Sequence, residues 1–386
     1  MKITCSQEQL NRGLSIVGKA VTTRTTLPVL NNILLSTDNG RLRLTATNLE
    51  VAITYWLPCL SIEREGAATI PARLLTEFVG SLPNDDVTIA LNETNWNAHI
   101  TAGRYEADIR GLRADEFPTL PVLGGAPLAL LPAGLLREMI TQVAFAASTD
   151  DNRPVLAGVL MRFRGNRLTL VAADGFRISI RHAELEQPVG AEGEISIIVP
   201  ARAMNELARV LPDAGAGEDT QVSVTVTPNG NQVLFAAPNL QVTSRLVEGK
   251  YVNFEQIVPS DWKTRVSAPT SDMLKGMRVA SYFAKDNASL VRLAMSAGSD
   301  VSPGLVTISA TAAEVGGNQT QLDAMIEGTG GQIAFNAKYV LDVLGVIPTP
   351  NVLLETQSPG APGVFRPSNP ELQFLHIIMP MHIPGN

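Results

Sequence analysis

Residues 27–53, LPVLNNILLSTDNGRLRLTATNLEVAI, and residues 153–180, RPVLAGVLMRFRGNRLTLVAADGFRISI, follow one pattern that decides the fold. Residues 288–300 and 304–328 form a looser third version. Later in each copy, a strand end is followed by about ten helical residues that stop at a proline; these segments are residues 69–83, 198–212 and 334–348. Because the pattern recurs roughly every 125 to 135 residues, the sequence predicts three similar domains, residues 1–124, 125–255 and 256–386.

Length and composition agree with three globular domains. The 386 residues exceed what one core usually holds, and with 45% hydrophobic and 17% charged residues each domain can bury a core. The opening residues, MKITCSQEQL, lack a signal-peptide pattern, and no apolar stretch is as long as a membrane span, so we expect a cytoplasmic protein. Cys5 and Cys59 are predicted to be small buried residues without a disulfide.

Basic residues gather on predicted helices although the net charge is −7. In the first helix Leu10, Leu14 and Val17 recur at helical spacing, while Arg12 and Lys19 share another face. The same design places apolar residues opposite basic ones in two later helices, with Lys275, Arg278 and Lys285 in one and Arg202 and Arg209 in the other. These faces are either simply solvated or bind phosphates without reading base sequence.

Strand signals dominate the rest of the chain. Tight hairpins are predicted at Asp38–Asn39–Gly40, at Gly165–Asn166 and at Pro228–Asn229–Gly230. Leucines that alternate with arginines in residues 41–44 indicate sheets with one solvated face, so helices should cover the other. Residues 213–220 and 358–367, rich in Gly, Ala and Pro, are predicted to be loops. The fold class is therefore α+β, with antiparallel sheets and helices collected on one side.

Motifs for chemistry are sparse. The sequence has no phosphate-binding P-loop and no HExxH pair, and its four histidines are scattered, so no cofactor and no metal are predicted. Asp150, Asp151 and Asp174 are either the acid–base or metal-binding groups of a hydrolase, or turn-forming residues. Residues 47–50, TNLE, occupy the same place in the first copy with no acid at the turn position, which favours the turn interpretation.

Short motifs along the whole chain resemble the β subunit of bacterial DNA polymerase III, the family of sliding clamps. They are LPVLNNILL, TNLEVAI, IPAR, RPVLAGV, AADGFRIS, VPAR, RLVEGKY, FNAKYVLDVL and IIMPM, in this order. The resemblance implies a non-catalytic DNA sliding clamp. Two chains would join head to tail into a ring of six clamp domains, with antiparallel sheets outside, helices inside, and duplex DNA through the hole.

The resemblance also implies which residues touch DNA and which join the two chains. The residues at DNA-contacting positions are Arg24, Arg73, Thr149, Asp150, Arg153, Pro154 and Arg202. The expected dimer interface places Ala107 and Ile109 of one chain against Tyr282 and Phe283 of the other.

A groove for short linear peptides of the clamp loader, the replicative polymerase and repair proteins is the third implication. Its positions are Leu156, Ala173, Gly175, Phe176, Arg177, Ile178, Val252, Gln256, Ile257, Gly363, Ile377, Ile378, Met379, Pro380, Met381, His382 and Ile383. From the residues alone, IIMPM is either an adaptable docking segment or a last core strand. A triplicated scaffold that binds proteins without encircling DNA is the alternative function.

Overall fold

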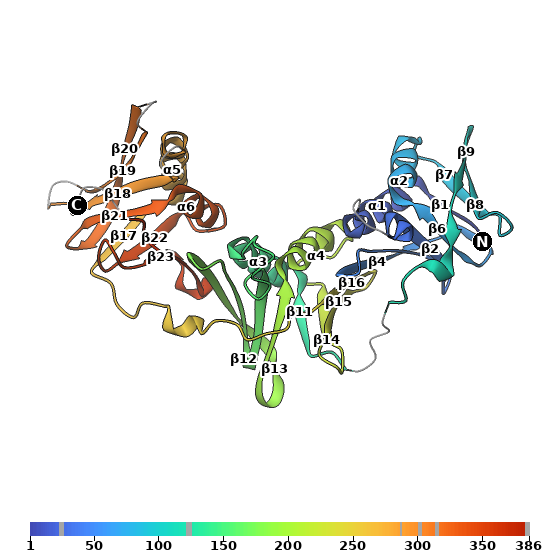
Figure 1. Cartoon of the computed structure of the whole chain (residues 1–386), viewed down its shortest axis with the longest axis horizontal. Helices are drawn as coiled ribbons and strands as arrows, with labels where there is room; N and C mark the ends of the chain where they lie inside the picture. Colours follow the sequence, from blue (N-terminus) through green and yellow to red (C-terminus); the bar gives the residue numbers. More distant parts are fainter. Residues whose placement is uncertain (23–26, 121–125, 286–287, 300–302, 313–315, 383–386) are drawn as a thin grey trace. The chain divides into compact units, whose positions relative to one another are not determined.

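The computed structural model describes residues 1–22, 27–120, 126–285, 288–299, 303–312 and 316–382, with the backbone alone at residues 190–192. Three repeats follow one another, each with a strand, a helix, a group of strands, a second helix and three strands (Figure 1). The first repeat has β1 (Lys2–Ser6), α1 (Gln7–Val17), β2 (Asn32–Asp38), β3 (Arg41–Thr47), β4 (Val51–Pro58), β5 (Ser61–Arg64), β6 (Ala67–Pro71), α2 (Ala72–Ser81), β7 (Asp86–Leu91), β8 (Asn97–Ala102), β9 (Tyr105–Arg110) and β10 (Leu112–Arg113), with short 3-10 turns η1 (Gly18–Ala20), η2 (Pro28–Asn31) and η3 (Ala114–Glu116).

The other two repeats keep this order of elements. The second has β11 (Ala129–Pro132), α3 (Ala133–Val143), η4 (Ala144–Ala146), β12 (Gly158–Ala173), β13 (Arg177–Pro200), α4 (Ala201–Asp213), β14 (Gln221–Val226), β15 (Gln232–Ala237) and β16 (Leu240–Arg245). The third follows η5 (Phe254–Gln256) and has β17 (Thr264–Pro269), α5 (Thr270–Ala284), β18 (Leu290–Ser296), β19 (Gly304–Ala312), β20 (Gly316–Gly328), β21 (Gly331–Asn336), α6 (Ala337–Leu344), β22 (Asn351–Thr356), β23 (Gly363–Pro367), η6 (Pro370–Leu372) and β24 (Phe374–Ile378).

Helices cover one face of the strands, which confirms the α+β prediction. In the first repeat α1 contacts α2, β3 and β4, and in the third α5 contacts α6, β19 and β20 (Figure 1). A glycine permits this close approach in both: a Cβ on Gly13 would lie 2.8 Å from Leu44 Cδ1, and one on Gly276 2.8 Å from Ile308 Cδ1. The apolar residues predicted for α1, Leu10, Leu14 and Val17, are fully buried.

Sheets run from one repeat into the next. The last strand of the second repeat, β16, pairs antiparallel with β4 of the first, from Leu240–Tyr55 to Ser244–Val51. The last strand of the third repeat, β24, pairs in the same way with β13 of the second, from Arg177–Ile378 to Arg181–Phe374. One type of strand pairing therefore joins each repeat to the one before it.

Contacts divide the chain into two compact units. Unit 1 contains Met1–Arg137 and Arg202–Leu246, and unit 2 contains Glu138–Ala201 and Val247–Asn386. The second repeat thus contributes β14, β15 and β16 to unit 1 and β12 and β13 to unit 2. The domain limits at residues 124 and 255 remain predictions, and residue 124 lies outside the described residues.

The hairpins were predicted unevenly. Asn39 and Gly40 form the two-residue turn between β2 and β3, and residues 227–231 connect β14 to β15, as predicted. The hairpin at Gly165–Asn166 stays a prediction: both residues lie within β12, whose residues 158–164 pair with residues 194–200 of β13 and whose residues 167–173 pair with residues 178–184. The register shifts on both sides of Gly165, which has a φ of 59° and is exposed. Part of the predicted loop 358–367 is also a strand, β23.

Both cysteines are free, and Cys5 is buried as predicted while Cys59 is half-buried. Burial raises the pKa of the Cys5 thiol to about 12, so this thiol stays protonated at neutral pH. Among the described residues, no helix has the length and apolar character needed to span a membrane.

Candidate functional site

Pairing of β13 with β24 brings the two halves of the predicted groove together inside unit 2. Arg177 lies opposite Ile378 and Ile178 opposite Ile377 in the ladder. One residue beyond it, the Met379 N–H donates to the Phe176 carbonyl oxygen at 2.8 Å. Residues about 200 positions apart in the sequence therefore form one surface.

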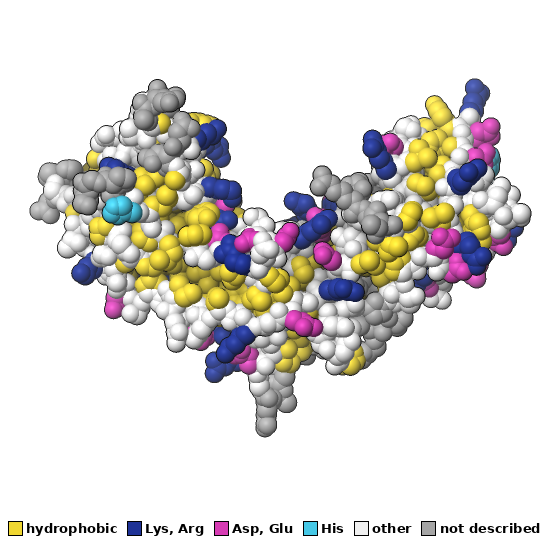
Figure 2. Space-filling view, in the orientation of Figure 1, with side chains coloured by type: hydrophobic (Ala, Val, Ile, Leu, Met, Phe, Trp, Pro, Cys, Tyr) yellow, Lys and Arg dark blue, Asp and Glu magenta, His cyan; other side chains and the backbone are white. Residues whose placement is uncertain are grey.

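Large apolar side chains lie exposed along this surface. Phe176 is 60% exposed, Met379 44%, Ile257 40% and Val252 39%. In the space-filling view, hydrophobic side chains gather over the part of unit 2 where β12, β13 and the strands of the third repeat meet (Figure 2). Exposed apolar side chains gathered on one part of a protein are typical of a protein-binding site.

A buried hydrophobic cluster supports the patch from below. It joins Ala173, Ile178 and Ile377 to side chains of the linker before β17, and Leu156 packs against it half-buried. These four predicted groove residues therefore form the floor. Gln256 lies exposed on η5, in the same linker as Val252 and Ile257.

Several other predicted groove residues turn away from this surface. Ile378 is fully buried in the core of the third repeat, and Gly363 is pressed against Phe335 of the same core. The Met381 N–H donates to the Ala334 carbonyl, and its half-buried side chain packs beside Ala334. Pro380 is half-buried and His382 exposed, whereas Ile383 lies outside the described residues.

A tight turn projects Phe176 outward. Asp174 Oδ1 accepts hydrogen bonds from the Phe176 N–H at 2.9 Å and the Arg177 N–H at 3.1 Å. Gly175 adopts a φ of 98°, a left-handed conformation that favours glycine. The carboxylate of Asp174 thus forms the turn, as the sequence predicted.

Arg177 is a buried structural residue, which corrects its expected place on the peptide-binding surface. Its side chain is 5% exposed, and its Nε donates to Asp174 Oδ2 at 3.0 Å. Nη1 donates to Asp342 Oδ2 at 2.6 Å and Nη2 to the Phe145 carbonyl at 2.9 Å. The guanidinium also lies over the Tyr339 ring at 4.4 Å. Arg177 therefore joins the second repeat to α6 beneath the groove and is a positioning residue.

The neighbouring loop at residues 149–154 is tied to the same turn. Arg153 donates from Nε to Asp150 Oδ2 and from Nη1 to the Asp174 carbonyl, both at 3.0 Å. Hydrogen bonds from the Asn152 N–H, then from the Asn152 side chain and Arg153, hold the pKa of Asp150 below its usual range. Thr149 and Pro154 are exposed. Among the described residues, no group of three His, Cys, Asp or Glu side chains is placed to hold a metal ion.

Basic residues of the first repeat and of α3 have structural partners that the sequence did not reveal. Lys19 Nζ lies 2.5 Å from Asp213 Oδ2, and Arg12 donates to the Asp213 carbonyl. Arg137 of α3 lies 2.5 Å from Glu218, in the same acidic loop. Those carboxylates already partly neutralise the basic face.

One cation recurs at the same place in the second helix of every repeat. Arg73 of α2 and Arg202 of α4 are exposed at this position, and Lys338 of α6, which was not predicted, is the third. Side-chain exposure is 89% for Arg73 and 69% for Lys338. Arg24 lies outside the described residues. The proposed contacts with DNA stay predictions.

The predicted interface residues lie in the first and third repeats. β9 is the edge strand of a five-stranded sheet, with Ala107 half-buried. Ile109 is only 3% exposed, so its side chain belongs to the core and its backbone alone is available to a partner. Tyr282 is 61% exposed at the end of α5, while Phe283 packs half-buried on the third core. Tyr105, which was not predicted, is 55% exposed on the same strand, β9.

Comparisons with known proteins match the whole chain. Models of the N-terminal, central and C-terminal domains of the DNA polymerase III beta subunit match residues 1–121, 130–253 and 255–382. The chain is 33% identical to the beta sliding clamp of Synechocystis sp., over 99% of this chain and 100% of that protein. It is 28% identical to the beta sliding clamp of Staphylococcus aureus, over 99% of each.

Solved structures agree. The DNA polymerase sliding clamp of Bacillus subtilis superposes with a TM-score of 0.90 at 28% identity, over 99% of both chains. A sliding clamp of Pseudomonas aeruginosa bound to griselimycin superposes with a TM-score of 0.89 at 28% identity, over 99% of this chain and 100% of that one.

Proposed function

Because this chain belongs to the family of DNA polymerase III beta subunits, the sliding clamps, we propose that two copies close a ring around duplex DNA and tether the replicative polymerase to it. Proteins of this family are non-catalytic processivity factors, which excludes a hydrolase that uses Asp150, Asp151 and Asp174. Asp150 and Asp174 are engaged in turn-forming hydrogen bonds, in keeping with that role. A cytoplasmic location remains a prediction.

The observation that carries the proposal is the strand pairing that joins successive repeats. In both cases the third strand after the second helix of a repeat pairs with a strand that lies between the two helices of the preceding repeat, β16 with β4 and β24 with β13. One strand of each class is left over, β9 in the first repeat and β20 in the third. Among the described residues, β9 has β8 as its one strand partner, and the first half of β20 has only β19.

The unpaired backbone N–H and C=O groups of such edge strands can form hydrogen bonds with a strand of another chain. Pairing β9 of one chain with β20 of another repeats the internal arrangement and forms a head-to-tail contact. Two such contacts close a ring of six domains, because each chain contributes one edge of each class.

Exposed side chains support the same junction. Between the second and third repeats, Arg177 packs on Tyr339 of α6. The equivalent position in the first repeat is Leu74 of α2, which is 52% exposed. Tyr282, at the end of α5, is 61% exposed. We infer that these two apolar side chains are covered when the second chain binds.

Encirclement explains how a weakly attractive inner surface holds DNA. Contacts to phosphates carry no base information and weaken as salt rises, so the cations at positions 73, 202 and 338 attract any duplex. Arg73 and Lys338 each pair with a carboxylate one helical turn later, at 2.8 Å in both cases. These acids reduce the attraction, which favours sliding. Retention then depends on ring closure, and a tethered polymerase gains a high effective concentration at its template.

The test is whether retention depends on the topology of the DNA. A clamp loaded onto a nicked circular plasmid is expected to stay bound through gel filtration and to be released once a restriction enzyme cuts the circle. Equal retention before and after the cut would favour the alternative, a scaffold or ordinary DNA-binding protein that does not encircle DNA.

We also propose that the exposed patch formed by Phe176, Val252, Ile257 and Met379 is the groove for partner peptides. The clamp loader, the replicative polymerase and repair proteins would bind it through short linear segments. Its buried floor supplies shape, and the flexible Met379 side chain adapts to different ligands.

Met379→Ala is therefore expected to weaken binding of a polymerase docking peptide by about tenfold or more, since truncating an apolar anchor typically removes over 1 kcal/mol. Fluorescence anisotropy with a labelled docking peptide measures the change. Met325→Ala is the matched control, because Met325 is 69% exposed on β20, outside the patch. Equal affinities of both variants would place the groove elsewhere.

A further inference from the structure

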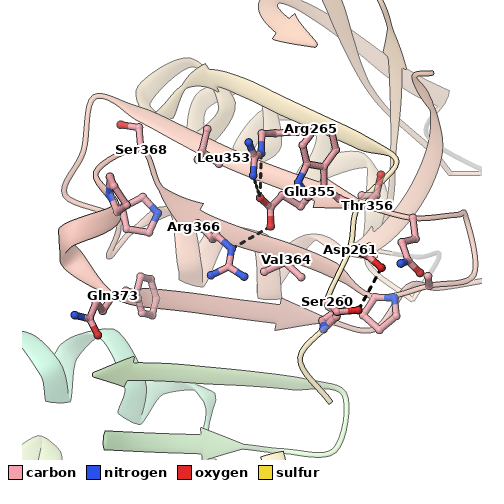
Figure 3. Close-up of a pocket in the computed structure, with 18 of the residues that line it drawn as sticks. Ser260, Asp261, Arg265, Leu353, Glu355, Thr356, Val364, Arg366, Ser368 and Gln373 are labelled. Carbon is pink, nitrogen blue, oxygen red and sulfur yellow. Dashed lines mark hydrogen bonds and ion pairs between the residues drawn. The ribbon is translucent and has the colours of Figure 1, made fainter. Parts of the chain in front are cut away.

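A cavity of about 510 Å³ lies in the third repeat (Figure 3). It is formed by the end of the linker, residues 259–262, and by side chains of β17, β22, β23 and β24. Trp262, Val364 and Phe374 give it an apolar wall, and Arg265, Glu355 and Arg366 give it a charged floor. This volume falls in the range of sites that hold small ligands or a few peptide residues.

Glu355 holds the two arginines of the floor in place. Its side chain is 9% exposed, and its Oε1 accepts from Arg265 Nε at 3.0 Å and Nη2 at 2.7 Å. Oε2 accepts from Arg366 Nε at 3.0 Å, so the two guanidinium groups flank one carboxylate (Figure 3). Arg265 also lies over the Trp262 ring at 4.4 Å. Both arginines are therefore fixed before any ligand arrives.

Both arginines retain side-chain N–H groups that can donate hydrogen bonds to a ligand. Each side chain is 33% exposed, and no hydrogen bond to a described residue uses Nη1 of Arg265 or either Nη of Arg366. Glu355 balances one of the two positive charges. The remaining charged group of the lining, Asp261, is exposed on the linker, where it accepts a hydrogen bond from Ser260.

We propose that this cavity binds a peptide carboxylate that lies next to an apolar side chain, namely an acidic residue flanking the segment held in the groove. Guanidinium groups with free Nη atoms suit a carboxylate, and the wall of Trp262 and Phe374 suits the apolar neighbour. Val364 links the cavity to the floor of the groove, because it lines the cavity and packs in the same buried cluster as Ile178 and Ile377. The identity of the occupant rests on the proposed groove.

Trp262 gives a direct readout of occupancy. The chain has three tryptophans, and replacing Trp56 and Trp96 by Phe leaves Trp262 as the one indole. This reporter is titrated with acetyl-Phe-Glu-amide and with acetyl-Phe-Gln-amide, which differ only in the carboxylate. The Glu peptide is expected to change the fluorescence saturably, and the Gln peptide to bind about tenfold more weakly, as expected for a charge-assisted hydrogen bond.

Two substitutions in the reporter shift the affinity for the Glu peptide in opposite directions. Arg366→Gln is expected to weaken it about tenfold, with little change for the Gln peptide. Asp261→Asn is expected to strengthen it, because a nearby negative charge is removed. Asp261 is exposed, so this variant tests the site even if Arg366→Gln destabilises the fold.

Equal affinity for the two peptides, no saturable signal with either, or indifference to both substitutions would overturn the proposal. These dipeptides lack a docking motif, so their binding does not depend on the groove. Loss of the effect of Met379→Ala with retained carboxylate binding would refute the groove and leave the cavity intact.

Discussion

Arg177→Ala is expected to lower the free energy of unfolding of unit 2 by about 3–5 kcal/mol, the range found when one partner of a buried ion pair is removed. The substitution leaves Asp174 and Asp342, whose side chains are 13% and 27% exposed, without their shared cation. It also leaves the Phe145 carbonyl without its donor and removes the guanidinium from the Tyr339 ring. Urea denaturation followed by circular dichroism measures the loss.

Lys338→Ala is the matched control for Arg177→Ala. Lys338 pairs with the same carboxylate, Asp342, at 2.8 Å, but its side chain is 69% exposed and one helical turn away. Exposed pairs of this spacing contribute about 0.3–0.5 kcal/mol. Similarly small losses of unfolding free energy in both variants would show that the buried Arg177 does not stabilise the contact between the second repeat and α6. Arg177→Lys is not expected to restore stability, because an ammonium lacks the planar fork that reaches three acceptors.

Asp108→Pro is expected to open the ring by weakening the dimer about 30- to 100-fold. Gly103 and Arg104 form a two-residue turn between β8 and β9, with Ala102 opposite Tyr105. In such hairpins the pair next to the turn exchanges hydrogen bonds, so the N–H of residue 108 points to the free edge. Proline removes this donor, and an unmade backbone hydrogen bond at an interface costs roughly 2–3 kcal/mol.

Asp108→Ala is the control, since it removes the same carboxylate, and with it the 3.0 Å contact to His99, while keeping the N–H. An edge strand tolerates proline, so the first repeat should remain folded in both variants. Sedimentation equilibrium gives the dimer constants, and the plasmid assay gives retention on circles. A proline variant that dimerises as tightly as the alanine variant would argue that β9 is not the joining edge.

Local features of the fold were predictable from the sequence, and long-range ones were not. The β2–β3 hairpin was found because Asn39 and Gly40 specify their own turn. Gly363 looked like a loop residue, yet a Cβ there would lie 2.3 Å from the Phe335 ring, so close packing requires the glycine.

For the site residues, too, the approximate position was predictable from the sequence and the orientation of the side chain was not. Their approximate positions followed from the repeated motifs and from resemblance, and the ladder between β13 and β24 brings both halves of the patch together. Which side chains point outward depends on strand register. This explains why Ile109 and Ile378, chosen as surface residues, are buried. Arg177 donates a hydrogen bond to Asp342, 165 positions later in the sequence, and no local sequence pattern predicts this contact.

Because the sheets continue from one repeat into the next, they also determine which truncated fragments of the chain can fold. A fragment that ends at residue 124 loses β16 and leaves β4 with an unsatisfied row of backbone donors and acceptors. A fragment that begins at residue 256 does the same to β24, which loses β13. Such pieces are prone to aggregate. Excising a single repeat therefore also destabilises its neighbour. Insertions are best tolerated at exposed turns away from the strand pairs β4–β16 and β13–β24.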